Sequence, residues 1–146
     1  MYIGLDLGTS GLKCVLIGED QKVLAEATAP LTVSRPEEGH SEQAPSDWIS
    51  AAETVFDWLS AQKGLARVKG IGLSGHMHGA TLLDKRDEVL RPCILWNDTR
   101  SHLEASELDS DPDFRRLTGN IVFPGFTAPK LLWVARHEPE IRARVA

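Results

Sequence analysis

The chain has 146 residues, of which 42% are hydrophobic and 25% charged, a composition typical of a globular domain with a real apolar core. Its formal net charge of −5 provides no basic surface, so nucleic acid and anionic membranes are not expected as partners. No apolar run approaches the roughly 20 residues that span a bilayer, and the amino terminus lacks the features of a signal peptide. We therefore expect a cytoplasmic protein that acts on small molecules.

The cysteines, Cys14 and Cys93, lie far apart in apolar stretches. Their spacing is not that of metal ligands, and free cysteine is among the most buried residue types. Both thiols are therefore predicted to be reduced and packed inside the protein.

An antiparallel meander is predicted at the start of the chain. Three apolar stretches joined by glycine-containing turns cover residues 2–7, 12–17 and 22–28. In the first stretch apolar residues alternate with Gly4 and Asp6, which is the period of a β-strand.

The middle of the chain predicts a crossover to a parallel strand. Residues 30–45 are polar and turn-rich, and we expect them to cross between elements without regular structure. Apolar residues then recur at helical spacing and predict a helix from Pro45 to about Lys63: Trp48, Ile49, Ala52, Val55, Phe56 and Leu59. Residues 68–74 predict a buried strand, and the strand, helix, strand order implies a right-handed crossover in a mixed sheet.

The remaining residues predict short elements. A small hairpin is expected from residues 81–83 and 88–90. Asn97 or Asp98 can cap a polar helix that ends near Leu108. Further helices are predicted at 111–119, 127–136 and from 140 onward, and the last of these has no cap, so we expect the sequence to end inside a domain.

The first segment that suggests chemistry lies at the end of the first strand and in the turn that follows. Its polar residues and glycines are Asp6, Gly8, Thr9, Ser10, Gly11 and Lys13. Glycines let the backbone approach an anion, hydroxyls and an ammonium group bind phosphate oxygens, and a carboxylate suits magnesium. The alternative is a plain hairpin whose aspartate caps a backbone amide.

Asp6-Leu7-Gly8-Thr9-Ser10 resembles the first phosphate motif of the actin, hexokinase and sugar-kinase superfamily, and its place at the amino terminus is that of the FGGY carbohydrate kinases. The resemblance implies an α/β, ribonuclease-H-like domain with a mixed sheet and flanking helices. It also implies ATP and Mg²⁺ as cofactors.

The second segment, Leu73 to Ala80, follows the predicted parallel strand. Open α/β sheets bind ligands at the carboxyl ends of their strands, so its glycines and polar residues suggest a loop at a cleft. A solvated surface turn is the alternative, and a metal site lacks further ligands nearby. The loop resembles a segment of the xylulokinases within the FGGY family, which implies that Met77 and His78 contact the ketose. The family commonly has glutamine in place of His76.

The third segment, Trp96-Asn97-Asp98-Thr99-Arg100, combines an aromatic ring with polar groups, as a sugar subsite requires. Core packing for Trp96 and helix capping for its neighbours are the alternatives. The segment resembles the Trp-Asn-Asp-x-Arg stretch of xylulokinases. That resemblance implies Trp96, Asn97 and Asp98 as sugar-lining residues, and Arg100 as a weaker candidate.

The resemblance runs from Tyr2 to about Ile141 and implies a kinase that transfers the γ-phosphoryl group of ATP to D-xylulose. Residues 1–146 would be a partial FGGY amino-terminal domain without the second lobe. The family's aspartate base lies outside it, so we expect no turnover from this chain alone. The alternatives are a kinase for another substrate, such as ribulose, gluconate or glycerol, and a non-catalytic module that self-associates as a homodimer.

Overall fold

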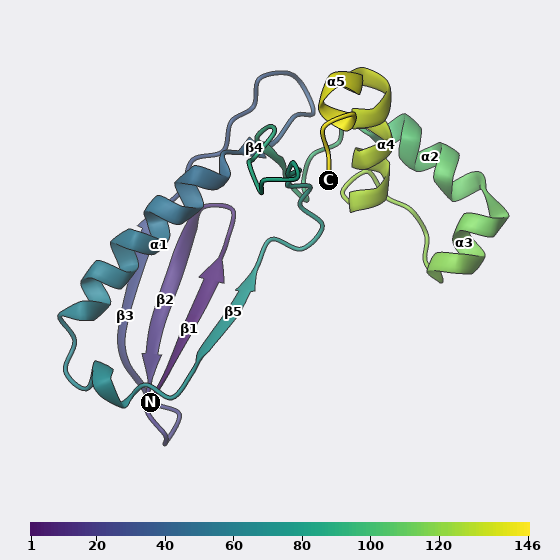
Figure 1. Ribbon diagram of the computed structural model, residues 1–146. Helices are drawn as coiled ribbons and strands as arrows, with labels where there is room; N and C mark the ends of the chain where they lie inside the picture. The colour runs from purple at the N-terminus through teal and green to yellow at the C-terminus, as the bar shows by residue number, and fades with distance from the viewer. The chain divides into compact units, whose positions relative to one another are not determined.

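The computed structural model describes residues 1–146, which form two compact units (Figure 1). The first, here called the sheet unit, comprises Met1–Val33 and Ser46–His76. The second, the helical unit, comprises Ser34–Pro45 and Met77–Ala146. No helix is both long and apolar enough to span a lipid bilayer.

A four-stranded mixed sheet with the order β3-β2-β1-β5 forms the sheet unit. Its strands are β1 (Tyr2–Leu7), β2 (Gly11–Ile17), β3 (Val23–Pro30) and β5 (Ile71–Gly75). The first three pair antiparallel and β5 pairs parallel to β1. The predicted meander and the predicted mixed sheet are therefore confirmed.

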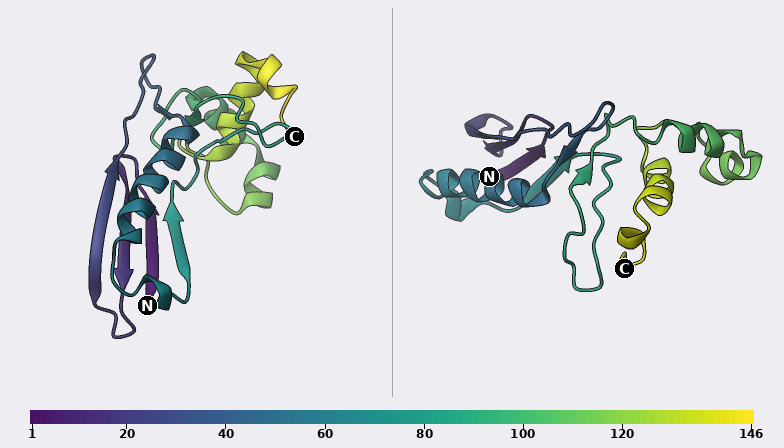
Figure 2. Two further views of the ribbon diagram at one scale, coloured as in Figure 1. Left: turned by 60° about the vertical axis from the view of Figure 1, so that its left-hand side comes forward. Right: turned by 90° about the horizontal axis from the view of Figure 1, so that it is seen from above.

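Helix α1 (Pro45–Ser60) lies along one face of this sheet (Figures 1 and 2). A stripe of residues four positions apart, Ala51, Val55 and Leu59, faces the sheet and is buried. Burial of each large apolar side chain here contributes about 1.5–3 kcal/mol. The apolar residues of the sheet in this core are Ile3, Leu5, Leu12, Cys14 and Leu16.

The predicted helix was partly wrong in its extent and in its buried face. It ends at Ser60, and a short 3-10 turn, η1 (Leu65–Arg67), follows Gly64. Ile49 and Phe56 are 64% and 40% exposed. Both lie off the buried stripe, because a step of one or two residues turns a helix by about 100° or 200°.

The prediction of a buried strand at residues 68–74 is wrong, since every residue of β5 is exposed. Leu73, for example, is 80% exposed. The strand is at the edge of the sheet and pairs with β1 alone. Apolar composition makes a strand suitable for burial, but a strand is buried only where another element covers it, and no element covers β5 here.

A small two-stranded ribbon, β4 (Glu42–Gln43) with β6 (Cys93–Ile94), opens the helical unit. The segment expected to have no regular structure thus contains a short strand. The hairpin predicted at 81–83 and 88–90 is confirmed: Leu83 and Val89 form an antiparallel bridge, and the Leu90 N–H donates to the Leu82 carbonyl at 2.9 Å. Both cysteines are free and buried, as predicted.

Four helices follow: α2 (His102–Ser110), α3 (Pro112–Thr118), α4 (Thr127–His137) and α5 (Pro139–Arg142). Helix α2 packs against α4, and the Arg136 guanidinium lies 3.5 Å from the Glu104 carboxylate. The predicted cap of α2 was wrong, because the helix begins after Ser101 and the Asp98 carboxylate has other partners.

Candidate functional site

The turn between β1 and β2 is closed by a hydrogen bond from the Gly8 N–H to the Gly11 carbonyl, at 2.9 Å. Neither glycine has a positive φ, so the turn does not need their left-handed freedom. It needs their small size instead, because a Cβ on Gly11 would lie 2.8 Å from the Ala29 carbonyl oxygen. We call residues 8–11 the hairpin.

The tip of the hairpin is attached to the end of β3. The Leu31 N–H donates to the Ser10 carbonyl at 3.0 Å, while the Ser10 side chain is exposed and Thr9 is half-buried. Backbone contacts therefore hold the tip and leave the Ser10 hydroxyl at the surface.

Asp6 and Lys13 are cross-strand partners at the base of the hairpin. Side chains alternate along β1, and Leu5 faces α1, so Asp6 and its partner lie on the opposite face. The Lys13 ammonium is 3.1 Å from the Glu26 carboxylate, and both side chains are more than half exposed. Exposed ion pairs of this kind contribute about 0–1 kcal/mol, so an anion could displace Glu26 at low cost.

A shallow hollow of about 390 Å³ lies on this face of the sheet. Gly4 and Gly72, which are register partners on β1 and β5, line it together with Asp6 and Lys13. The structure thus brings Asp6 and Lys13 together, as the sequence predicted. No group of three or more His, Cys, Asp or Glu side chains is placed to hold a metal ion, so Asp6 contributes a single carboxylate.

His76 lies beside the hairpin, and the sequence left its role unassigned. Its ring stacks on Trp48 with 5.4 Å between centroids, and its backbone N–H donates to the Leu7 carbonyl at 3.3 Å. The imidazole Nε2 is buried without a hydrogen-bond partner. Burial lowers the pKa of His76, while the negative charge of Asp6 and a hydrogen bond with the Gly8 backbone oppose that change.

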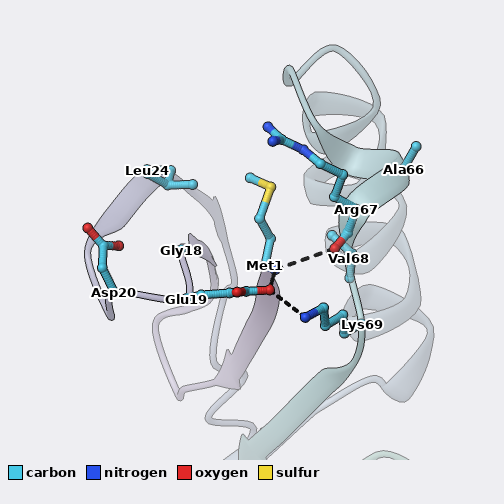
Figure 3. A pocket seen from close by; sticks show the side chains of 9 residues that line it. All are labelled: Met1, Gly18, Glu19, Asp20, Leu24, Ala66, Arg67, Val68 and Lys69. Carbon is cyan, nitrogen blue, oxygen red and sulfur yellow. Dashed lines mark hydrogen bonds and ion pairs between the residues drawn. The ribbon is translucent and has the colours of Figure 1, made fainter.

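A larger hollow of about 680 Å³ lies at the other end of the sheet unit, beside the amino end of β1 (Figure 3). Figure 3 shows the Glu19 carboxylate paired with the Lys69 ammonium at its edge. The Met1 ammonium lies 3.9 Å from the same carboxylate. This hollow contains none of the residues that the sequence singled out, and Asp6 and the hairpin lie at the carboxyl end of β1.

In the helical unit, Met77 and His78 form a tight turn, here called the His78 turn. Met77 is 70% exposed, and His78 has a φ of 61°, which is uncommon for a residue with a Cβ. The His78 ring packs on Phe126 with 4.6 Å between centroids. Both side chains named by the sequence are thus held at the surface, where a ligand can reach them.

Residues 96–98, here called the Trp96 loop, divide into an exposed part and a buried part. Trp96 is 51% exposed, while the Asn97 side-chain oxygen accepts a hydrogen bond from the Ser41 hydroxyl at 2.8 Å. Asp98 is fully buried and accepts from the Ser41 N–H at 2.6 Å and from the Arg100 guanidinium at 2.7 Å. These contacts favour a supporting role for Asp98 over the direct sugar contact expected from sequence.

Arg100 links this loop to a buried network of charges. Its guanidinium lies 2.6 Å from the Glu42 carboxylate, which also pairs with Arg91 at 2.6 Å. Burial alone would lower the pKa of Arg100, but hydrogen bonds and attraction from Asp98 and Glu42 outweigh it and raise the pKa. The guanidinium also lies 5.0 Å from the centre of the Trp133 ring, a cation–π distance.

Sequence reasoning missed Glu42, Arg91 and Lys130. Glu42 is 7% exposed and Lys130 is fully buried. The sequence shows only that Glu42 lies between two polar residues, Ser41 and Gln43, and that Lys130 lies at the start of a predicted helix, and neither is a signal for a buried charge.

A mixed sheet with a glycine hairpin at the carboxyl end of β1 defines an α/β domain of the sugar-kinase type. The model of the N-terminal domain of the FGGY family of carbohydrate kinases matches residues 1–146. The chain belongs to the FGGY family of carbohydrate kinases.

Known proteins with high similarity support this assignment. The chain is 54% identical to the xylulose kinase of Escherichia coli over 97% of its own length and 29% of that protein. It superposes on the crystal structure of a xyloylose kinase from Brucella ovis with a TM-score of 0.94 and 62% identity, over 99% of this chain and 31% of the other. It also superposes on the crystal structure of a gluconate kinase from Lactobacillus acidophilus, with a TM-score of 0.83 and 26% identity, over 99% of this chain and 30% of the other. The chain thus spans about 30% of the length of these relatives.

Proposed function

We propose that this chain is part of an ATP-dependent kinase that converts D-xylulose to D-xylulose 5-phosphate. The observation that carries the proposal is the exposed His78 turn, in which the Met77 and His78 pair matches the ketose-binding segment of xylulokinases. The 54% identity with the xylulose kinase of Escherichia coli supports the same substrate.

Each group of candidate residues suits one substrate of this reaction. Neutral imidazole both donates and accepts, so His78 suits sugar hydroxyls, and the exposed Trp96 ring suits the apolar face of a sugar. Phosphoryl transfer depends mainly on positioning and on charge neutralisation. The Gly8 to Gly11 backbone, the Thr9 and Ser10 hydroxyls and the Lys13 ammonium are proposed to hold phosphate oxygens.

Mg²⁺, when bound with ATP, would neutralise charge on the phosphates. A magnesium ion held with substrate phosphates takes one or two protein carboxylates, directly or through water. Asp6 is exposed on the face of the sheet that α1 leaves open, and it fits this donor set.

Titration calorimetry tests the substrate. D-xylulose is added to the chain alone and then together with Mg²⁺ and a non-hydrolysable ATP analogue. We expect heat of binding from D-xylulose, reduced in His78→Ala. A folded protein that gives no heat with either ligand would contradict the proposed sugar site.

Turnover of the complete protein tests the phosphate side. Asp6→Ala is expected to lower kcat about a hundredfold or more, the size typical for loss of a charged group that stabilises the transition state. Asp57→Ala, which removes an exposed carboxylate from α1, is the matched control and should leave kcat unchanged. Activity of Asp6→Ala close to that of the unaltered protein would remove Asp6 from the site.

The second candidate function is a kinase that acts on another substrate, and the similarity in fold to a gluconate kinase supports this candidate. Identification of the phosphorylated product from a mixture of D-xylulose, ribulose, gluconate and glycerol separates these substrates.

A self-associating binding module is the third candidate, because β5 is exposed along its whole length. A mass that rises with protein concentration, without affinity for nucleotide or sugar, would favour this module.

A further inference from the structure

Lys130 is a buried charge that the proposed reaction does not use. It lies in the first turn of α4, and none of its surface is exposed. Its ammonium donates to the His78 carbonyl at 2.8 Å and to the Gly125 carbonyl at 2.7 Å. One side chain therefore joins the His78 turn to the segment that precedes α4.

This arrangement has a cost in free energy. Burial lowers the pKa of the Lys130 ammonium from 10.5 to about 8, against opposing attraction from Asp98 and Cys93 and with a smaller repulsion from Arg100. An apolar side chain of similar shape could fill the same space without that cost. The hydrogen bonds that Lys130 makes are the feature that an apolar side chain could not replace.

The His78 turn needs such support. A left-handed φ is strained in a residue with a Cβ and persists only where surrounding contacts hold it. The carbonyl that Lys130 binds belongs to that strained residue. The His78 ring is held separately by Phe126.

Gly125 connects the same segment to the Trp96 loop. A Cβ at this position would lie 2.4 Å from the Trp96 carbonyl oxygen, so the two backbones approach too closely for any other residue. Lys130 thus holds a segment that contacts both loops: Gly125 touches the Trp96 loop, and Phe126 touches His78.

We propose that Lys130 is a positioning residue that fixes the His78 turn relative to the Trp96 loop, so that the ligand groups of both loops keep one geometry. The inference deepens the proposed function and rests on it for the identity of the ligand. The hydrogen bonds of Lys130 and their effect on the two loops can be tested without any ligand.

Three variants of the chain test the proposal. Lys130→Met keeps the approximate shape and removes all donors, Lys130→Gln keeps an N–H donor without the charge, and Lys85→Met alters an exposed lysine of the same unit as the control. Circular dichroism establishes that each variant is folded. Hydrogen exchange of backbone amides and the NMR signals of the His78 ring then report on the turn.

We expect amide exchange in the His78 turn and the Trp96 loop to be about tenfold faster or more in Lys130→Met, because the variant loses both hydrogen bonds of the ammonium and a single charged hydrogen bond already contributes about that factor. The His78 ring protons should also lose the shift that the nearby Phe126 ring imposes. D-xylulose affinity should fall about tenfold, Lys130→Gln should recover part of each effect, and Lys85→Met should match the unaltered chain.

Exchange rates and His78 signals that stay unchanged in a folded Lys130→Met would overturn the proposal, whatever the sugar affinity. If Lys130→Met does not fold, the Lys130 ammonium signal of the unaltered chain decides. Slow exchange of its protons with water supports the buried hydrogen bonds, and fast exchange contradicts them. Absence of D-xylulose binding by the unaltered chain counts against the proposed function alone, since the exchange measurements still decide the role of Lys130.

Discussion

The hairpin of the sheet unit and the two loops of the helical unit are held in place by different means. The hairpin depends on backbone hydrogen bonds and on glycines, and the ion pair at its base, between Lys13 and Glu26, is exposed. The His78 turn and the Trp96 loop depend on buried charges, above all Lys130 and Asp98.

The difference matters for how each region responds to change. A backbone turn needs only small residues at the points of close approach, so its side chains remain available to a ligand. Buried charges instead tie together residues that are far apart in sequence, such as Ser41 with Asp98 and His78 with Lys130. Removing one partner leaves the other buried and unpaired, which lowers the free energy of unfolding.

The largest expected effect is on the buried network. Asp98→Ala should lower the free energy of unfolding by about 3–5 kcal/mol, because the Arg100 guanidinium loses a buried counter-ion and the Ser41 N–H loses its acceptor. Urea denaturation measures the change. Asp113→Ala, which removes the carboxylate of the exposed pair with Arg116, is the control and should have little effect. Equal effects of the two substitutions would remove the distinction between the regions.

The next effect concerns the hairpin. Gly11→Ala should lower the free energy of unfolding by about 1–3 kcal/mol, since its Cβ would lie 2.8 Å from the Ala29 carbonyl oxygen. Thermal or urea denaturation checks this value. Gly72→Ala is the matched control in the same sheet, because the atom nearest to its Cβ is 4.0 Å away. If Gly11→Ala lowered the free energy of unfolding no more than Gly72→Ala does, the hairpin would not depend on the close approach of Gly11 to β3.

A smaller effect is expected from Lys130 at alkaline pH. Its pKa is about 8 in the folded chain and 10.5 when unfolded, so between these values only the unfolded chain keeps the proton. The contribution of Lys130 to the free energy of unfolding should therefore rise with pH across this window. Denaturation of the unaltered chain and of Lys130→Met at the same pH values separates the contribution of Lys130 from those of the other titrating groups. The unaltered chain should gain stability relative to the variant, and parallel curves would contradict the low pKa.

The smallest effect is expected from His76 in the sheet unit at acid pH. Burial lowers its pKa below 6.5, so on acidification the unfolded chain takes up the proton first. Stability should therefore be lost as the pH falls below about 6.5. His76→Gln should make this loss less steep in denaturation experiments without magnesium. His102→Gln, at an exposed position, is the control, and an identical slope in both variants would exclude the effect.

Much of the sheet unit could be predicted from sequence because its signals are local. Alternation along β1 and β2, the glycines of the hairpin and the helical spacing of Val55 and Leu59 each depend on residues close together in the chain. Asp6 and Lys13 were placed correctly beside the hairpin for the same reason, since a hairpin sets the register of its strands. Their roles toward phosphate and metal stay predictions.

Other features could not be predicted because they depend on partners distant in sequence. Asp98 followed by a helical pattern resembles a helix cap, yet the carboxylate pairs with Arg100 and reaches Ser41. β5 has the composition of a buried strand and is exposed, because no neighbour covers it.

The sequence by itself determined the strand order of the meander, the first helix, the hairpin and the family resemblance, since periodicity and short motifs carry that information over a few residues. Only the tertiary structure decided which charges are buried. Lys130 reaches the His78 carbonyl across 52 positions of sequence. The free energy of a buried charge depends on the atoms that surround it, and those atoms come from segments that only folding brings together.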